Sequence, residues 1–346
     1  MEAVNTFRYV ALTKNLESKK NSIRSNSTNH PRNPNERKNY LISELDKKTF
    51  LITGGGGNLS SAFVKALKKY APNCQIICPS KIELDIENPE SFNSFRSFKP
   101  DFVLHCAAKV NADFCESHPD KARRNIVEGT ENSYNFSSKI GAYFFYPQSF
   151  LIFDGDENPT TEKTSPAPLS VYGRYKLEAE QLLLLGDQTL VVRMGGFFGG
   201  ESKDKNFVGK MHSHINFSLQ TGRDRIEVGE RIWQPTYTKD LAENILVLLS
   251  LKKFGIYHMA SLGHASFLEV ASTMVEVLGL SQKIAVVPFA NDLGWKNDVA
   301  SRPNSVLMNN SKLILEDLNF QRNWKQALTE YLSLPFFNNS ETTIKT

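Results

Sequence analysis

The sequence predicts an α/β fold, a doubly wound parallel sheet with a smaller C-terminal lobe. Short apolar runs alternate with helix-length stretches over residues 47–194, and this alternation is typical of a parallel sheet covered by helices on both faces. The chain of 346 residues is long enough for such a domain and a second lobe. Beyond residue 195 the alternation weakens, so we expect the smaller lobe over residues 195–334, with segments that return to the main sheet.

Each expected strand is a short apolar run, and the stretches between the runs are long enough for helices. After the first run, Leu59, Phe63 and Ala66 fall on one face of a helix, and a further core helix is expected over residues 170–186. The expected strands are TFLIT (49–53), QIICP (75–79), PDFVLHCAA (100–108), AYFFYP (142–147) and TLVVRM (189–194).

The two ends of the chain have compositions that disfavour folding. Residues 15–40 are rich in Asn, Ser, Lys, Arg and Pro and have few large apolar side chains, so they cannot bury enough surface to offset the entropy of ordering. We therefore predict a disordered basic extension over residues 1–46 and a flexible tail over residues 335–346. Deleting residues 1–44 is accordingly expected to leave activity unaltered.

Charge and composition argue against several classes of partner. Residues 1–48 hold ten Lys and Arg against five Asp and Glu, which leaves the rest of the chain at a net charge of −1. A nucleic-acid-binding protein would carry its positive charge on the folded body. No apolar stretch approaches the ~20 residues needed to span a membrane, no apolar signal segment is seen, and the four cysteines form no C-x-x-C pair. We expect a cytoplasmic protein that binds neither nucleic acid nor membrane.

The glycine-rich stretch LITGGGGNLS (51–60) ends the first expected strand and opens the first helix. At such a turn a phosphate meets unpaired backbone N–H groups and the positive end of the helix dipole. Glycines at positions 54 and 57 let the backbone approach a ligand closely, and Ser60 replaces the third small residue of the usual G-x-x-G-x-x-G spacing. The context favours a dinucleotide-binding turn of the Rossmann type over a plain glycine loop.

The end of the second expected strand bears on the choice of dinucleotide. Sites selective for NAD usually place an acidic residue there, where it binds the ribose hydroxyls. This chain instead has Ser80 and Lys81, which suit a ribose phosphate better than a carboxylate would. NADPH is therefore the expected cofactor, with NADH still possible, and Asp85 is expected at the adenine edge.

The stretch SVYGRYKLEAE (170–180) places Tyr172 and Lys176 four residues apart, on one face of a helix. A neighbouring ammonium would stabilise tyrosinate and lower the pKa of Tyr172 toward neutrality, which makes the phenol a usable general acid or base. Upstream, Ser149 can present a hydroxyl to a substrate carbonyl. The three residues fit hydride transfer to or from a carbonyl. No metal site is expected, because His212 and His214 have no cluster of carboxylates or cysteines beside them.

Taken together, these stretches resemble the extended short-chain dehydrogenases/reductases, and within them the dTDP-4-dehydrorhamnose reductase-like branch. The resemblance runs from Lys48 to Leu334 and depends on the order and spacing of several motifs. These are TGGGGNLS, IELDIENPESF, PDFVLHCAAKVNADFCESHPDKA, IFDGDENPTTEKTSPAPLSVYGRYKLEAE, WQPTYTKDLAENI, GIYHMASLGHASFLEVA and SRPNSVLMNNSKL.

The resemblance implies an NAD(P)H-dependent reductase of a nucleotide-activated 4-keto-6-deoxy sugar, which would serve the synthesis of cell-surface polysaccharide precursors. Tyr172 would donate the proton, Lys176 would bind the nicotinamide ribose, and Ser149 would hydrogen-bond the reacting carbonyl. A homodimer is possible for this architecture. The expected cofactor-binding residues are Gly54, Gly57, Asn58, Leu59, Ser80, Lys81, Asp85, Ala107, Ala108, Lys109, Tyr172 and Lys176. The expected substrate-binding residues are Ser149, Phe150, Gly196, Gln234 and Arg302.

The chain departs from that branch at three positions. Phe150 stands where an Asp commonly follows the hydroxyl residue, and Gly196 stands where a bulky aromatic residue commonly lies beside the sugar. Asn125 comes one position earlier than the usual helix Asn, which would turn it by ~100° around the helix. An altered sugar pocket is therefore expected.

Two alternatives stay open at the level of sequence. One is an epimerase or dehydratase of the same superfamily, although Phe150 argues against the acid/base carboxylates that a dehydratase needs. The other is a non-catalytic regulatory subunit that binds NADP and a partner protein, because this branch includes a regulatory subunit of methionine adenosyltransferase.

Overall fold

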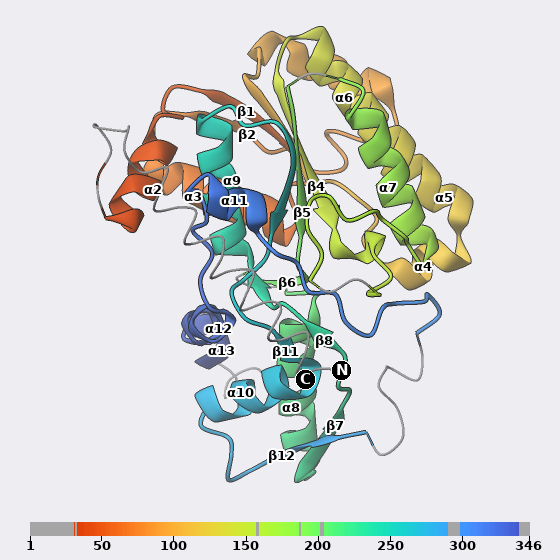
Figure 1. The fold of residues 1–346 in the computed structure, drawn as a ribbon, viewed down its shortest axis with the longest axis vertical. Coiled ribbons are helices and arrows are strands. Elements are labelled where there is room, and N and C mark those ends of the chain that lie inside the picture. Colours follow the sequence, from red (N-terminus) through yellow and green to blue (C-terminus); the bar gives the residue numbers. More distant parts are fainter. Residues whose placement is uncertain are drawn as a thin grey trace.

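The computed structural model describes residue 31 and residues 33–156, 159–186, 188–200, 204–289 and 298–338. Its centre is a parallel sheet of six strands in the order β10-β5-β4-β3-β1-β2 (Figure 1). The strands are β1 (Thr49–Thr53), β2 (Gln75–Ile77), β3 (Phe102–His105), β4 (Tyr143–Ser149), β5 (Thr189–Met194) and β10 (Gly255–Met259). Successive strands wind outward in both directions from β1, so the predicted doubly wound α/β fold is confirmed.

Helices cover both faces of this sheet, because the central strands are apolar on both sides. One face packs against α2 (Pro34–Ser43), α3 (Asn58–Tyr70) and α9 (Thr238–Ser250). The other face packs against the 3₁₀ helix η2 (Pro89–Phe98), α6 (Gly129–Lys139) and α7 (Val171–Leu183). The short helices α4 (Ala112–Ser117) and α5 (Pro119–Arg123) lie beside α7.

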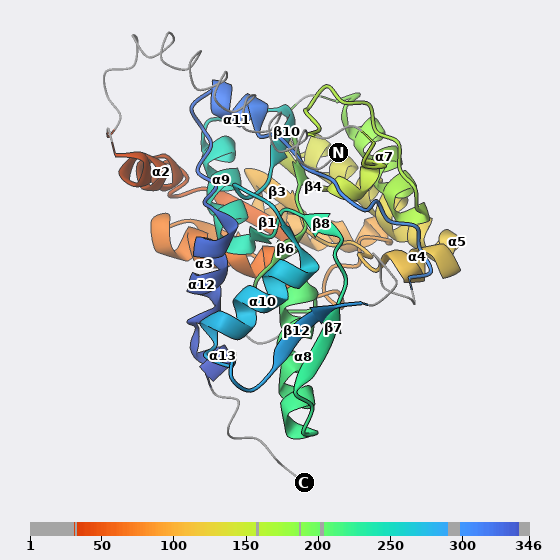
Figure 2. The same cartoon turned by 60° about the horizontal axis from the view of Figure 1, so that its bottom comes forward.

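The smaller lobe lies at the carboxyl ends of the strands (Figure 2). It has a core of its own, which includes Met211, Trp233 and Trp324. Strand β10 and helix α9 return from this half of the chain to the main sheet. Its helices are α8 (Phe207–Gln220), α10 (Phe267–Val277), α12 (Trp324–Leu332) and α13 (Pro335–Asn338), and α11 (Ser311–Leu315) packs on β10. Its paired short strands are β6 (Phe197–Phe198) with β9 (Thr236–Tyr237), β7 (Arg225–Val228) with β12 (Ala285–Pro288), and β8 (Ile232–Trp233) with β11 (Ala265–Ser266).

The predicted disordered extension is wrong for residues 33–46. Asn33 caps helix α2 through its side chain, and Leu41, Ile42 and Leu45 are at most 4% exposed in the main core. The polar composition obscured this, because only the last two turns carry the apolar side chains that the core needs. Residues 1–30 and 32 of the predicted extension lie outside the described residues.

Two basic side chains of α2 also find acidic partners far along the chain. Arg37 pairs with Asp317, and Lys38 pairs with Glu243, whose side chain is only 4% exposed. These partners lie on separate segments of the chain, so the contacts are invisible to local composition.

The predicted flexible tail is wrong for its first residues. Phe337 in α13 is 2% exposed and its ring lies 4.8 Å from the rings of both Tyr331 and His212. These aromatic contacts fix the short helix against the lobe. Residues 339–346 lie outside the described residues.

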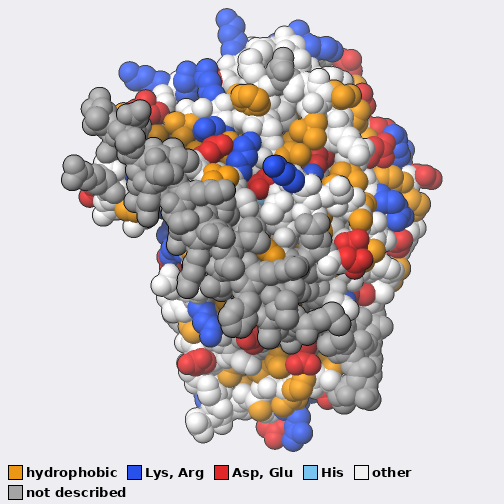
Figure 3. Space-filling model, in the orientation of Figure 1, with side chains coloured by type: hydrophobic (Ala, Val, Ile, Leu, Met, Phe, Trp, Pro, Cys, Tyr) orange, Lys and Arg blue, Asp and Glu red, His pale blue; other side chains and the backbone are white. Residues whose placement is uncertain are grey.

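Over the described part of the face shown in Figure 3, acidic and basic side chains are interspersed among apolar ones. No helix among the described residues is both long and apolar enough to cross a membrane. The same residues contain no group of three or more His, Cys, Asp or Glu side chains arranged to hold a metal ion.

Candidate active site

The glycine turn between β1 and α3 is shaped by close backbone approach. Gly54 has a φ of +74°, and a Cβ there would lie 2.8 Å from the backbone nitrogen of Ala107. A Cβ on Gly55 would lie 2.8 Å from the carbonyl oxygens of Cys78 and Pro79. The chain therefore passes between the ends of β2 and β3 only because these residues have no side chain. The first N–H groups of α3 then face the carboxyl edge of the sheet.

Ser60 closes this turn with hydrogen bonds, a role that its small size alone did not predict. Its hydroxyl donates to the carbonyl oxygens of Gly54 (2.7 Å) and Gly57 (2.9 Å) and accepts from the Gly57 N–H (3.2 Å). The turn is thus held in shape before any ligand arrives. Residues 56–60 line a cavity of about 410 Å³ on one side of the turn.

A second cavity of about 390 Å³ lies on the other side of the same turn. The side chain of Lys81 is 72% exposed and lies 4.0 Å from Glu87, so its ammonium is accessible beside this cavity. The predicted residues that line it are Gly54, Gly57, Ser80, Lys81, Asp85, Ala107, Ala108 and Lys109. The structure therefore brings the expected cofactor-binding residues to two cavities that share the glycine turn.

Asn125 also lines the second cavity, so the expected rotation away from the site is wrong. Residues Arg124–Glu128 form a turn of π-helix between α5 and α6. A π-turn accommodates one extra residue in a helix and so offsets the one-position shift in the sequence. Asn125 accepts a hydrogen bond from the Lys109 N–H (2.6 Å) and donates to Glu87 (2.8 Å).

Helix α7 carries Tyr172 and Lys176 to the first cavity, close to the end of β4. Ser170 caps the helix by accepting from the Gly173 N–H at 3.2 Å. A Cβ on Gly173 would clash with the Leu151 carbonyl oxygen, so glycine permits the close approach of α7 to the segment after Ser149. Ser149 and Tyr172 therefore line the same cavity, and Ser149 is close enough to Tyr172 to act on its pKa.

Burial dominates the protonation of this group. The pKa of Tyr172 is raised to about 12, chiefly by burial and against the hydrogen bond from Ser149. Burial lowers the pKa of Lys176 to about 7, and its Nζ lies 2.7 Å from the Pro147 carbonyl oxygen and 3.8 Å from the centre of the Tyr146 ring. The expected depression of the Tyr172 pKa by Lys176 is therefore wrong for this structure, because the ammonium points at β4 and burial disfavours tyrosinate.

The cavity near Tyr172 also has walls that the sequence did not single out. The lobe contributes Lys205 and Asn206 just before α8, and these residues follow no recognisable motif. Residues from both halves of the chain line it together: Asn58, Leu59, Ser149, Phe150, Tyr172, Lys176, Gly196, Lys205 and Asn206. It therefore lies between the glycine turn and the lobe, with the Ser/Tyr/Lys group on its wall.

Gly196 leaves room for an aromatic ring from elsewhere in the chain. A Cβ at this position would lie 2.7 Å from the ring of Trp233 and 3.4 Å from the ring of Phe150. Trp233 in turn packs on Phe267, with ring centroids 5.2 Å apart. Gly196 is thus packed against aromatic rings, of which the Phe150 ring also lines the cavity near Tyr172.

Comparison with known proteins places this geometry in a family. A family model described as the RmlD substrate binding domain matches residues 48–334. The chain belongs to this family. Among curated members that it resembles, the spore coat polysaccharide biosynthesis protein SpsK of Bacillus subtilis is 30% identical over 82% of this chain and 96% of that protein. The methionine adenosyltransferase 2 subunit beta of Rattus norvegicus is 27% identical over 78% of this chain and 82% of its own length.

Solved structures give the same assignment to the RmlD family. A dTDP-4-dehydrorhamnose reductase from Clostridium acetobutylicum has a TM-score of 0.75 and 30% identity, covering 83% of this chain and 99% of its own. The enzyme of that name from Bacillus anthracis, solved in complex with NADP, has a TM-score of 0.75 and 26% identity, covering 83% and 99%. The expected resemblance to the dTDP-4-dehydrorhamnose reductase-like branch is confirmed.

Within this RmlD-family fold, Gln234 and Arg302 are not among the residues that line the cavity near Tyr172, and their substrate-binding role stays a prediction. The Gln234 amide is 2% exposed and bonds to the backbone of Ser261 and Met308. The guanidinium of Arg302 pairs with Asp113 (3.0 Å) and Asp298 (2.9 Å). Both side chains are therefore engaged in holding loops together.

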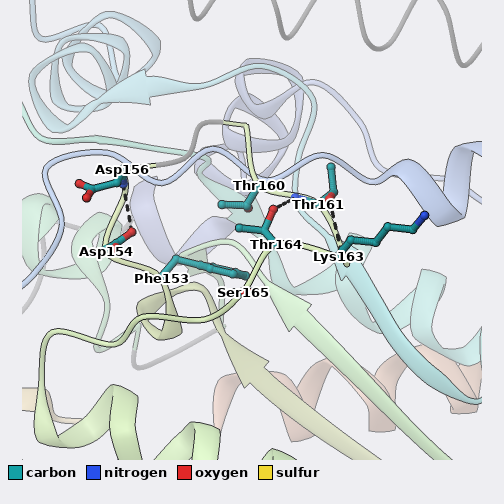
Figure 4. A pocket seen from close by; sticks show the side chains of 8 residues that line it. All are labelled: Phe153, Asp154, Asp156, Thr160, Thr161, Lys163, Thr164 and Ser165. Atoms are coloured by element: carbon teal, nitrogen blue, oxygen red, sulfur yellow. Dashed lines mark hydrogen bonds between the residues drawn. The ribbon is translucent and has the colours of Figure 1, made fainter.

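A separate hollow of about 380 Å³ lies in the loop after β4 (Figure 4). Asp154 accepts there from the Asp156 N–H, and Thr164 accepts from the Thr161 N–H. Its lining shares no residue with the cavity near Tyr172. Since the hollow contains none of Ser149, Tyr172 and Lys176 and does not reach the glycine turn, we place the candidate active site at the Ser/Tyr/Lys cavity.

Proposed function

We propose that this chain is an NADPH-dependent reductase of a nucleotide-activated 4-keto-6-deoxy sugar, acting in the synthesis of cell-surface polysaccharide precursors. The observation that carries the proposal is that Ser149, Tyr172 and Lys176 lie together on the wall of one cavity that reaches the glycine turn. The names of the relatives support the substrate class, since two of them are dTDP-4-dehydrorhamnose reductases and a third serves spore coat polysaccharide synthesis.

The residues present fit a dinucleotide. Gly54 and Gly55 let the turn pack directly against the backbone at the ends of β2 and β3, and the N-terminus of α3 offers N–H groups and a partial positive charge to a pyrophosphate. Lys81, accessible beside the adjoining cavity, suits the additional phosphate of NADPH, and NADH, which lacks that phosphate, would fit the same cavity. When bound, the reduced nicotinamide would supply the hydride.

The chain's own residues would handle the carbonyl oxygen of the sugar. Ser149 would donate a hydrogen bond to that oxygen and so polarise the C4 ketone. The raised pKa of Tyr172, about 12, keeps the phenol protonated at neutral pH, as a proton donor requires. As negative charge develops on the oxygen, it becomes a stronger base than phenolate, and the proton moves from Tyr172 Oη to it. Lys176 would hold the nicotinamide ribose through its ammonium.

The test is oxidation of NADPH, followed by its absorbance, with a panel of nucleotide-linked 4-keto-6-deoxy sugars beside an NADPH binding titration. Turnover of any one sugar is the expected result. Tyr172→Phe should reduce kcat by about 10²- to 10⁴-fold while leaving NADPH affinity nearly intact, because only the proton donor is lost. Unchanged turnover in that variant would exclude Tyr172 as the donor.

A regulatory role is the second candidate, because the beta subunit of methionine adenosyltransferase 2 is among the relatives and matches over 82% of its length. Such a role predicts tight NADPH binding with no oxidation across the panel. An epimerase or dehydratase predicts instead that the sugar nucleotide is converted without net consumption of NADPH. Product analysis of the same reactions separates these outcomes from reduction.

A further inference from the structure

A row of buried polar side chains crosses the sheet directly below the candidate active site. In the strand registers, Gln148 of β4 pairs with Arg193 of β5, and Arg193 pairs with His258 of β10. Residues in register on parallel strands point to the same face. All three are at most 3% exposed. The face concerned is the one covered by α7, from which Glu180 reaches down to the row.

Glu180 and Arg193 form a bidentate ion pair within this row. The Arg193 Nη2 lies 2.5 Å from Glu180 Oε1, and its Nε lies 3.1 Å from Oε2. Both side chains are no more than 4% exposed. The free-energy cost of removing two charges from water offsets most of their mutual attraction, so a buried ion pair is weak evidence for a role in stability. A role in fixing the geometry of the groups around it is the alternative considered for this pair.

Gln148 connects this ion pair to the reacting group. Its Nε2 donates to Glu180 Oε2 and to the Lys176 carbonyl oxygen, each at 2.9 Å. Its Oε1 accepts from the Ser149 N–H at 2.8 Å. One amide therefore ties the backbone of Ser149, on β4, to the backbone of Lys176, on α7. A displacement of either element would break at least one of these bonds.

The cluster also bears on the charge of Lys176. Glu180, one helical turn further along α7, favours the ammonium and opposes the burial that lowers its pKa. The other groups that face Lys176 are neutral or inert: the Tyr146 ring on β4, the Cys106 thiol after β3, whose pKa burial raises, and His105 on β3, which burial keeps uncharged. Glu180 is thus the acidic group that acts on this ammonium.

We propose that Gln148, Glu180 and Arg193 form a positioning network that holds Ser149 and Lys176 in the arrangement needed for hydride reduction of the carbonyl. The inference rests on the proposed function for its kinetic readout. In this proposal Gln148 and Arg193 position Ser149 and Lys176. The residues that would contact the reacting carbonyl are Ser149 and Tyr172.

The first experiment is Gln148→Met, which keeps the length of the side chain and leaves the Glu180–Arg193 pair intact. We expect kcat to fall about 10- to 100-fold, since a misplacement near 1 Å costs that much, with KM values little changed. The control is Asp240→Asn, which weakens another bidentate pair, that of the buried Asp240 with the partly exposed Arg322. It should lower the melting temperature and leave kcat unaltered. Wild-type kcat in Gln148→Met, or equal losses in both variants, would overturn the proposal.

The second experiment uses NADPH affinity as a function of pH and so does not depend on turnover. Affinity should weaken as pH rises through the pKa of Lys176, about 7, as the ammonium is lost. In Glu180→Gln, and in the double variant Glu180→Gln/Arg193→Gln if the single one misfolds, the midpoint should move to lower pH by about one unit. An unmoved midpoint would refute the network. If wild-type protein binds NADPH with this profile but reduces no sugar, the proposed function fails and the network stands.

Discussion

Helix α2 makes a prediction that can be worked out from the structure, namely the cost of Ile42→Ala. Ile42 is 0% exposed and belongs to the core that α3, α9 and the sheet share. The substitution removes three buried carbons, worth about 0.8 kcal/mol each and about 2.5 kcal/mol together. The cavity left behind raises the expected loss of unfolding free energy to about 3–4 kcal/mol. This is a large share of the ~5–15 kcal/mol that holds an ordinary domain folded.

The assay is urea unfolding monitored by circular dichroism. Wild type and variants are fitted with one shared slope of the unfolding free energy against urea concentration. Asn39→Ala is the control, since Asn39 is exposed on the same helix, and it should shift stability by no more than about 0.5 kcal/mol. An Ile42→Ala midpoint equal to that of wild type would refute the packing of α2. The earlier expectation for a 1–44 deletion is reversed for the same reason, because that deletion removes α2 and should destabilise the folded chain.

Three further outcomes are expected. Burial lowers the pKa values of His105 and His258 from 6.5 to about 3. Between these pH values the unfolded chain binds more protons than the folded chain, so the free energy of unfolding should fall as the pH drops below 6.5. Urea midpoints that do not change between pH 6 and pH 4 would contradict this. Lys81→Ala should weaken NADPH binding about tenfold and spare NADH in parallel titrations, whereas equal losses would remove Lys81 from the phosphate site. Gly196→Ala should cost about 1–3 kcal/mol by overpacking against Trp233, and an unchanged melting temperature would mean that the ring moves aside.

Much of the fold follows from local pattern. The runs TFLIT and TLVVRM became β1 and β5 with the same limits, because strands buried on both faces are formed by mainly apolar runs. The glycine turn was predictable for a similar reason, since Gly54 adopts a conformation that other residues avoid. The i, i+4 spacing of Tyr172 and Lys176 was enough to place both on the same wall of one cavity.

Other features depend on contacts between distant segments. Gln234 lies in a conspicuous motif, yet its side-chain amide is hydrogen-bonded to the backbone of Ser261 and Met308. Asn125 looked displaced by one residue, yet a π-turn restores its position. Neither result can be read from spacing, because a hydrogen-bond partner or a helix defect is chosen by the packing around it.

The sequence by itself therefore determined the doubly wound sheet and the glycine turn, and it predicted the Ser/Tyr/Lys group that the structure brings to one cavity. The tertiary structure decided the protonation of that group, the ordering of α2 and the packing of the Trp233 ring beside Gly196. Periodicity and backbone conformation are local properties, so they are written in neighbouring residues. The pKa of Tyr172 depends on burial, and the folding of α2 depends on a core formed mainly by other elements, so both exist only once the chain has packed.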